Sequence, residues 1–306
     1  MFEMLFLGTS ASAPSAHRGL PAHIVLHRQY RFMIDCGEGT QRQILRSGIG
    51  FKRLDKVLIT HGHLDHILGL GGLISTLSRW EAMDRIEIWG GWWALERIKD
   101  LLFKVVLLGA RPEVAIEFYE ITPGVLLQDD KFQLSAFPVH HRGPGCFGFC
   151  FEEKARRPFL AAKAEALGVP AGPERRDLVQ GRPITLADGR VVHPDEVLGQ
   201  VLPGVKLVHV GDCGRTDNLQ LVVANADTLV IEATYLEHEA ELARKFGHLT
   251  AARAARLAAQ TGVRQLILTH ISRRYREKEV LDEARAIFAN TIVARDLEMV
   301  PIRKMG

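Results

Sequence analysis

The sequence predicts an α/β protein built on a β-sheet, with its functional side chains gathered at one edge of the sheet. Six short apolar or β-branched runs each end in an aspartate, a glutamate or a histidine. Segments with apolar residues at helical spacing separate these runs. Of the 306 residues, 47% are hydrophobic and 25% are charged. This composition is typical of a globular chain with its own core and excludes a disordered or collagen-like one.

The expected strands follow one another along most of the chain. They are residues 30–34 before Asp35, 56–60 before His61, 132–139 before His140 and His141, 206–210 before Asp212, 228–231 before Glu232, and 265–269 before His270. A first strand is expected in the apolar N-terminal stretch. Because strand ends and loops meet at one edge of such a sheet, these side chains should lie close together.

Five helices are expected between or after these strands. They are residues 41–47, 67–79, 93–107, 250–261 and 277–289. The Ala-rich fourth helix has an N-cap signal at Thr250.

Residues 152–203 interrupt the pattern of strands and helices. This segment holds six prolines, two Gly-containing turn signals, and eight basic and eight acidic residues. Loops longer than about 15 residues usually have a function or are disordered. We therefore expect a single domain over residues 1–306, with residues 152–203 inserted as a flexible projecting arm.

Charge, hydropathy and cysteine content exclude several classes of protein. No run of about 18 apolar residues is present, which excludes a membrane span, and the N-terminus lacks the basic region of a signal peptide. The formal net charge of +3 permits a polyanionic partner without requiring one. The four scattered cysteines form no Cys-x-x-Cys pair. A Cys146–Cys150 bridge is conceivable, but reduced buried thiols and a cytoplasmic location are favoured.

The clearest functional motif is residues 60–66, Thr-His-Gly-His-Leu-Asp-His, directly after an expected strand. His61 and His63 can face one point, whereas Asp65 and His66 can face a second from the start of the next helix. This arrangement suits two adjacent metal ions, as in many hydrolytic sites. Imidazole and carboxylate ligands are compatible with zinc, and also with manganese or iron. The simpler alternative is an exposed histidine-rich loop.

Three further strand ends complete the expected ligand set. It consists of His61, His63, Asp65, His66, one of His140 and His141, a bridging Asp212, and His270. Asp35 is expected to accept a hydrogen bond from a ligand imidazole.

The motif of residues 61–66 is similar to the His-x-His-x-Asp-His signature of the metallo-β-lactamase superfamily. Within it, the chain resembles the ribonuclease Z family of tRNA 3′-processing endonucleases, through residues 6–10, 34–41, 211–213, 232–234, 248–250 and 268–275. The resemblance implies a four-layer αββα sandwich, two zinc ions per subunit, hydrolysis of precursor tRNA near its 3′ end, and a homodimer. It also implies that the arm of residues 152–203 is an RNA-binding exosite.

Residue roles follow from this resemblance and from local sequence. Asp65 would bind metal and accept a proton, His141 is favoured over His140 as ligand, and Glu232 would orient His248. His248 would stabilise the phosphate or protonate the leaving oxygen, although a simple Glu232–His248 ion pair is the alternative. The candidate RNA contacts are Arg18, Arg175, Arg176, Arg273, Arg274 and Tyr275. A solvated basic turn is the alternative for residues 272–276.

The chain departs from the ribonuclease Z pattern at three places. Residues 14–19, Pro-Ser-Ala-His-Arg-Gly, differ from the usual Pro-x-Lys-x-Arg-Asn loop, Ile231 stands where the family has histidine, and Cys213 replaces threonine. None of these changes removes a ligand. The altered loop leaves a second reading open, a hydrolase of the same fold acting on a small phosphodiester or ester. A third is a non-catalytic metal-containing RNA-binding protein, although structural zinc sites usually consist mostly of Cys and His ligands.

Overall fold

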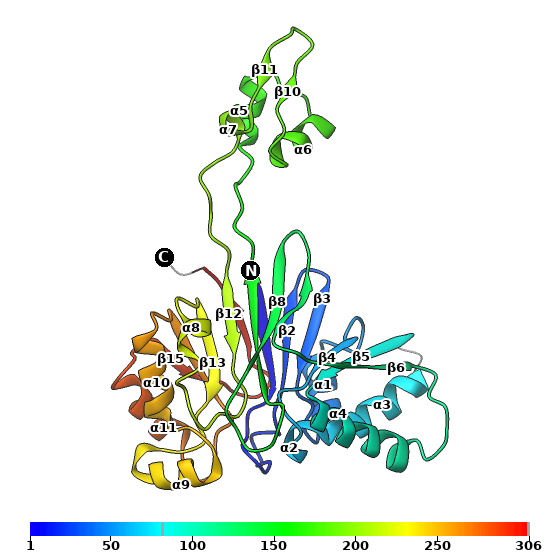
Figure 1. Ribbon diagram of the computed structural model, residues 1–306, viewed down its shortest axis with the longest axis vertical. Coiled ribbons are helices and arrows are strands. Elements are labelled where there is room, and N and C mark those ends of the chain that lie inside the picture. The colour runs from blue at the N-terminus through cyan, green and yellow to red at the C-terminus, as the bar shows by residue number, and fades with distance from the viewer. Residues whose placement is uncertain (81–82, 305–306) are drawn as a thin grey trace. The chain divides into compact units, whose positions relative to one another are not determined.

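Within residues 1–80 and 83–304, which the computed structural model describes, two seven-stranded β-sheets form the centre of the larger of two units (Figure 1). This unit comprises residues 1–152 and 205–306, and the smaller unit comprises residues 153–204. No helix of the described residues is both long enough and apolar enough to cross a membrane.

Each sheet mixes parallel and antiparallel strands. The first sheet has the spatial order β16 (Met299–Ile302), β1 (Phe2–Gly8), β2 (Ala22–His27), β3 (Tyr30–Ile34), β4 (Lys56–Leu58), β5 (Arg85–Gly90) and β6 (Ala115–Glu120). The second has the order β15 (Thr291–Val293), β14 (Gln265–Thr269), β13 (Thr228–Glu232), β12 (Lys206–His209), β9 (Phe147–Glu153), β8 (Phe132–Pro138) and β7 (Gly124–Gln128).

The parallel strands bring the functional residues to the sheet edges. In the first sheet β3 to β6 run parallel, and in the second β12 to β15 do so. Asp35 directly follows β3, Glu232 ends β13, and His270 follows β14. Ligands of open α/β sheets lie outside the carboxyl ends of the strands, so these ends mark the expected position of a site.

Helices cover the outer face of each sheet, giving four layers (Figure 1). On the first sheet lie α1 (Thr40–Ser47), α3 (Gly69–Trp80), α4 (Trp92–Lys99) and the π-helix η1 (Asp100–Val106); on the second lie α10 (Ala251–Gln260) and α11 (Glu277–Arg285). Between the sheets, six fully buried phenylalanines dominate the core: Phe2, Phe6, Phe32, Phe132, Phe149 and Phe151. The predicted αββα sandwich is confirmed.

Local sequence explains α10 well. Thr250 caps it, since its hydroxyl accepts a 3.2 Å hydrogen bond from the backbone N–H of Arg253. Five of its alanines are buried and let the helix pack closely on the sheet: Ala251, Ala252, Ala254, Ala255 and Ala258.

Two expected helices differ from the structure. The helix predicted over residues 93–107 is α-helical only to Lys99 and continues as a π-helix to Val106. The helix predicted over 277–289 ends at Arg285. Several strands were not predicted from the sequence, among them β2, β5, β9 and β16.

The smaller unit, residues 153–204, has a small core of its own. It contains α5 (Ala161–Ala166), α6 (Pro173–Val179), α7 (Pro194–Val197) and the short strand pair β10 (Ile184–Thr185) and β11 (Val191–Val192). Its buried apolar residues are Ala164, Val169, Leu178, Ile184, Val192 and Val197. The segment therefore carries ordered secondary structure and is not a bare loop.

Candidate metal centre

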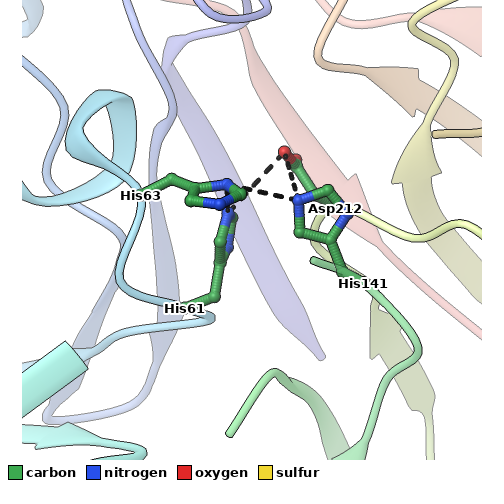
Figure 2. Close-up of side chains that lie close together, drawn as sticks. All are labelled: His61, His63, His141 and Asp212. Carbon is green, nitrogen blue, oxygen red and sulfur yellow. Dashed lines mark hydrogen bonds and ion pairs between the residues drawn. The ribbon is translucent and has the colours of Figure 1, made fainter. Parts of the chain in front are cut away.

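Three histidines and one oxygen of Asp212 form the first of two adjoining groups of potential ligands (Figure 2). Nδ1 of His63 lies 2.9 Å from Nε2 of His61 and 3.3 Å from Nε2 of His141. Oδ2 of Asp212 lies 3.8 Å from Nε2 of His61 and 3.7 Å from Nε2 of His141. Four donor atoms from three separate segments thus converge on one point.

The second group uses the other oxygen of Asp212. Oδ1 of Asp212 lies 3.5 Å from Nε2 of His66 and 3.3 Å from Nε2 of His270. Oδ2 of Asp65 lies 3.7 Å from Nε2 of His66 and 3.6 Å from Nε2 of His270. Asp212 therefore presents one carboxylate oxygen to each group.

The backbone turns sharply where these side chains enter the site. His63 precedes the short helix α2 (Leu64–Ile67), which places Asp65 and His66 in its first turn. Asp35 and His270, each directly after a parallel strand, have left-handed backbones with φ of 58° and 55°. Such a conformation costs a non-glycine residue about 1–3 kcal/mol and persists only where surrounding contacts impose it.

Asp35 and Thr60 orient two of the histidines. Oδ2 of Asp35 accepts a 2.8 Å hydrogen bond from Nδ1 of His66 and another of 2.8 Å from the hydroxyl of Thr60. Because that hydroxyl donates to Asp35, it can accept the 3.0 Å bond from Nδ1 of His61. The predicted contact between Asp35 and a histidine of the motif is confirmed.

On the second sheet, Glu232 and Thr234 orient two further histidines, His248 and His270, in the way that Asp35 and Thr60 do on the first. The hydroxyl of Thr234 donates to Oε2 of Glu232 at 2.5 Å and lies 2.9 Å from Nδ1 of His270, from which it can accept. Oε1 of Glu232 lies 2.9 Å from Nδ1 of His248 and accepts a 2.6 Å bond from the backbone N–H of Cys213. The expected pairing of Glu232 with His248 is present, and both residues are buried.

The electrostatic surroundings favour neutral imidazoles in the first group and an ionised Asp212. Burial lowers the pKa of His61 well below its ordinary value, and burial lowers that of His63 to about 4. Burial would raise the pKa of Asp212, but the imidazoles of His270 and His66 hold it well below its usual range. Neutral imidazole and carboxylate are the protonation states that bind metal ions.

Three carboxylates make the surroundings of the second group favourable for positive charge. Burial lowers the pKa of His66, but the carboxylates of Asp212, Asp35 and Asp65 outweigh that effect and raise it well above its ordinary value. Three buried polar atoms at this point have no hydrogen-bond partner among the described residues, namely Nε2 of His66, Oδ1 of Asp212 and Nε2 of His270. Buried polar atoms are rarely left unpaired, and a bound cation would satisfy all three.

The hydrogen bonds also fix which ring nitrogen points into the site. In His61, His66, His141 and His270 an oxygen acceptor holds Nδ1, for His141 the backbone carbonyl of Gly247 at 2.7 Å. An N–H at Nδ1 leaves the Nε2 lone pair available, which is how metal-bound histidines are usually oriented. The donor set and its orientation fit divalent metal ions.

The structure brings together all seven of the expected ligands. Of the two alternative ligands His140 and His141, only His141 lies in the first group. Its side chain is fully buried there, whereas His140 is exposed. His248 lies beside the second group, with its Nδ1 3.9 Å from Asp212 and its ring stacked on His270 at 5.5 Å between centroids.

Several candidate RNA contacts already have partners inside the protein. Arg18 donates to Thr9, to the backbone carbonyl of Ala294 and to Glu277, and its side chain is only 15% exposed. This engagement is consistent with an anchor for the loop of residues 14–19 and argues against a direct RNA contact.

Arg175 and Tyr275 also make contacts inside the protein. Arg175 donates to the backbone carbonyls of Pro170 and Val169 and lies over the ring of Phe159. Tyr275 packs against the core of the second sheet, with its hydroxyl buried. Both contacts use the groups that would otherwise meet RNA.

The remaining candidates are Arg176, Arg273 and Arg274. Arg176 and Arg273 are exposed and make no ion pair with the described residues, whereas Arg274 pairs with Glu239. Arg176 and Arg273 are therefore the basic side chains of this set that remain available to a phosphate.

Some functional residues were not anticipated. The hydroxyls of Thr60 and Thr234 orient ligands, and the backbone N–H of Ser12 donates a 3.1 Å hydrogen bond to Oδ2 of Asp65. The two threonines have a sequence signal, since each lies within two residues of a predicted site residue. The Ser12 contact has none, because it depends on how the loop folds.

All four cysteines are free and buried. Burial raises the pKa of Cys36 to about 12 and that of Cys146 and of Cys150 to about 11, so these thiols stay protonated. The expectation of reduced buried thiols is confirmed over a Cys146–Cys150 bridge.

Comparison with known proteins agrees with the fold. Residues 21–157 match the family described as Metallo-beta-lactamase superfamily, and residues 177–271 match the Beta-lactamase superfamily domain. Human tRNase Z, short form, has a similar structure, with a TM-score of 0.69 and 25% sequence identity over 99% of this chain and 100% of that one.

Two curated relatives are similar over nearly their whole length. Ribonuclease Z of Bradyrhizobium diazoefficiens is 48% identical over 302 residues, covering 99% of this chain and 100% of the relative. Ribonuclease Z of Listeria monocytogenes is 40% identical over 307 residues, covering 98% and 99%. With this similarity, and with a site that carries every residue of the family's His-x-His-x-Asp-His motif, the chain belongs to the ribonuclease Z family of metallo-β-lactamase-fold proteins.

Proposed function

We propose that this protein is a metal-dependent endoribonuclease that hydrolyses a phosphodiester bond at the 3′ end of precursor tRNA. The observation that carries the proposal is the division of Asp212 between two groups of ligands, Oδ2 toward His141 and Oδ1 toward His270. A carboxylate shared in this way is suited to two adjacent divalent ions, and we propose two zinc ions per subunit. Such a pair supplies Lewis-acid polarisation of the phosphate and an activated water nucleophile.

The protein's own residues hold and move protons around this point. The neighbouring imidazoles of His66 and His270 keep the pKa of Asp65 below its usual range despite its burial. Asp65 is therefore ionised and can take a proton from the attacking water as well as bind metal. The backbone N–H of Ser12 donates a hydrogen bond to Oδ2 of Asp65, the oxygen that faces His66 and His270, and holds this carboxylate in place.

His248 supplies the complementary acid. Burial lowers the pKa of His248, but the paired carboxylate of Glu232 outweighs burial and raises it to about 9. A protonated His248 can give its proton to the 3′ oxygen as the phosphorus–oxygen bond breaks. The products would be a tRNA with a free 3′ hydroxyl and a trailer with a 5′ phosphate.

Binding of precursor tRNA would use surfaces outside the metal centre. We propose that the smaller unit, residues 153–204, which corresponds to the predicted arm of residues 152–203, contacts the body of the tRNA through basic side chains such as Arg176. We also propose that Arg273 meets the RNA backbone near the site. Phosphate contacts of this kind dominate affinity and make it sensitive to salt. Action as a homodimer in the cytoplasm stays a prediction.

A side-by-side assay of precursor tRNA and bis(p-nitrophenyl) phosphate tests this function. We expect cleavage of precursor tRNA at the base of the 3′ trailer, loss of activity in EDTA, and recovery when zinc is restored. Cleavage of the small diester alone would favour the reading as a small-phosphodiester hydrolase. Tight tRNA binding without cleavage of either substrate would favour a non-catalytic RNA-binding protein.

A further inference from the structure

His63 differs from the other four histidines in how its ring is held. In those four an oxygen acceptor fixes Nδ1, whereas His63 turns Nδ1 into the site. Its remote nitrogen, Nε2, makes no hydrogen bond to the residues that the structure describes. Instead, the ring of His63 meets Trp93 edge to face, with 5.9 Å between centroids and an interplanar angle of 85°. Packing against Trp93 therefore orients the ring of His63, whereas a hydrogen bond at Nδ1 orients the rings of the other four histidines.

Trp93 touches both segments that carry the first group of ligands. A methyl group built on Gly62, between His61 and His63, would lie 2.9 Å from Cε3 of Trp93. A methyl group built on Gly143, two residues after His141, would lie 2.9 Å from Cζ3 of the same ring. These distances are too short for any real side chain, so both glycines are needed for the indole to fit between the two loops.

Arg97 contacts both Trp93 and the loop that carries His63. Its guanidinium lies 5.1 Å from the centroid of the Trp93 ring, and Nη1 donates a 2.8 Å hydrogen bond to the carbonyl of Gly62. Trp93 and Arg97 both come from α4, one turn apart. Helix α4 therefore contacts the loop of residues 61–63 twice, through the backbone carbonyl of Gly62 and through the ring of His63.

We propose that Trp93 is a positioning residue for the first metal site. By filling the space between Gly62 and Gly143, it holds His63 and His141 at the separation that lets both converge with His61 on one ion. This inference rests on the proposed metal centre and concerns one of its two groups. The second group, with His66 and His270, has no contact with Trp93 among those that the structure describes.

Metal binding to purified full-length variants tests the proposal. We would titrate metal-free Trp93→Ala, Trp93→Phe and wild-type protein with Co²⁺, following the visible spectrum and the number of ions bound. Trp93→Ala should bind one ion as wild type does and the other about 10–100-fold more weakly, the usual effect of losing an orienting partner. Trp93→Phe should recover most of this loss, because a phenyl ring still packs against His63.

Trp92→Ala is the matched control, because Trp92 is the adjacent residue of the same helix and is 53% exposed. It should leave both ions and the cobalt spectrum unchanged. Thermal unfolding of the metal-free proteins separates a misfolded variant from an altered site, with Trp93→Phe as the variant that keeps the packing.

The outcomes separate this inference from the proposed function. If Trp93→Ala binds two ions with wild-type affinity and an unchanged spectrum, the positioning role of Trp93 is overturned, but the proposed metal centre is not. Equal weakening of both ions in Trp93→Ala would also overturn it, because the effect would then be general. A wild-type protein that binds no Co²⁺ or Zn²⁺ would overturn the metal centre itself and this inference with it.

Discussion

Oδ1 of Asp212 lies 3.3 Å from Nε2 of His270, and neither buried atom has a hydrogen-bond partner among the described residues. The other oxygen of Asp212 faces the first group of histidines, 3.7 Å from Nε2 of His141. One side chain thus joins two groups of ligands, each of which contains residues that follow strands of both sheets. The consequences of removing it differ from those of removing any single histidine.

Asp212→Ala should lose both metal ions together, because each group then lacks its shared carboxylate oxygen. Metal analysis after purification in zinc would measure this loss. Asp217→Ala is the matched control, since Asp217 is an exposed nearby aspartate paired with Arg215, and it should keep full metal content. One ion retained at full occupancy in Asp212→Ala would instead assign Asp212 to a single site.

His248→Ala should keep both metal ions but lower the turnover of precursor tRNA by about 10²–10⁴, the usual range for a proton-transfer group. Cleavage of bis(p-nitrophenyl) phosphate should fall much less, since p-nitrophenolate leaves without needing a proton. His238→Ala is the control, because His238 is an exposed histidine of the same region. Equal losses on both substrates would indicate that His248 stabilises the phosphate and does not act as an acid.

Glu232→Gln should move the alkaline limb of the pH profile of precursor tRNA cleavage to lower pH. The Glu232 carboxylate raises the pKa of His248, so its removal lets burial lower that pKa and the acid form is lost at a lower pH. The kcat measured across the pH range, with metal content checked at each end, tests this expectation. An unmoved alkaline limb would show that another group sets it.

The sequence predicted the ligands better than it predicted their surroundings. Each ligand lies at a strand end or in one short motif, where local pattern is informative. Thr60 and Thr234 matter only because their hydroxyls lie between a carboxylate and an imidazole. Trp93 matters because the fold inserts it between two glycines. Side-chain positions of this kind depend on tertiary packing, which local sequence does not specify.

The candidate RNA contacts illustrate the same point. Arg18 lies in a loop whose family counterpart contains arginine, and local sequence does not show that Glu277, 259 positions away, pairs with it. Tyr275 follows two arginines and resembles a stacking residue, but the fold turns its ring toward the core. The internal partners of these basic and aromatic residues therefore become known only from the fold.

Arg18→Ala should act on stability more than on tRNA binding. Its guanidinium is largely buried and donates to Thr9, Ala294 and Glu277, so its loss should lower the free energy of unfolding by about 1–3 kcal/mol. Chemical denaturation measures this change.

Arg273→Ala is the contrasting variant to Arg18→Ala, since Arg273 is exposed and makes no ion pair with the described part of the chain. It should leave stability unchanged and weaken precursor tRNA binding. The reverse pattern, with Arg18→Ala equally stable and weaker in binding, would restore Arg18 as an RNA contact.

Removal of the arm separates chemistry from RNA binding. The backbones of Arg156 and Leu202 pair through hydrogen bonds of 2.9 and 2.7 Å, so residues 157–201 can be replaced by a short Gly/Ser linker without stretching the ends. Because residues 153–204 form a compact unit with its own core, folding and metal content of the rest should persist. Cleavage of bis(p-nitrophenyl) phosphate should also persist, since every ligand lies outside this segment.

Binding of precursor tRNA to the truncated protein should fall sharply and depend less on salt. Most arginines of the arm are paired within it, as Arg182 is with Asp177 and Arg190 with Asp188, so Arg176 is a better candidate contact than its neighbours. Arg176→Ala in the full-length protein should weaken binding and reduce the salt slope by roughly 1, as expected for one phosphate contact. Arg182→Ala is the matched control and should change neither quantity. If the truncated protein binds and cleaves precursor tRNA as the full-length protein does, the arm is not an RNA-binding element, and the tRNA must be held by the metallo-β-lactamase core alone.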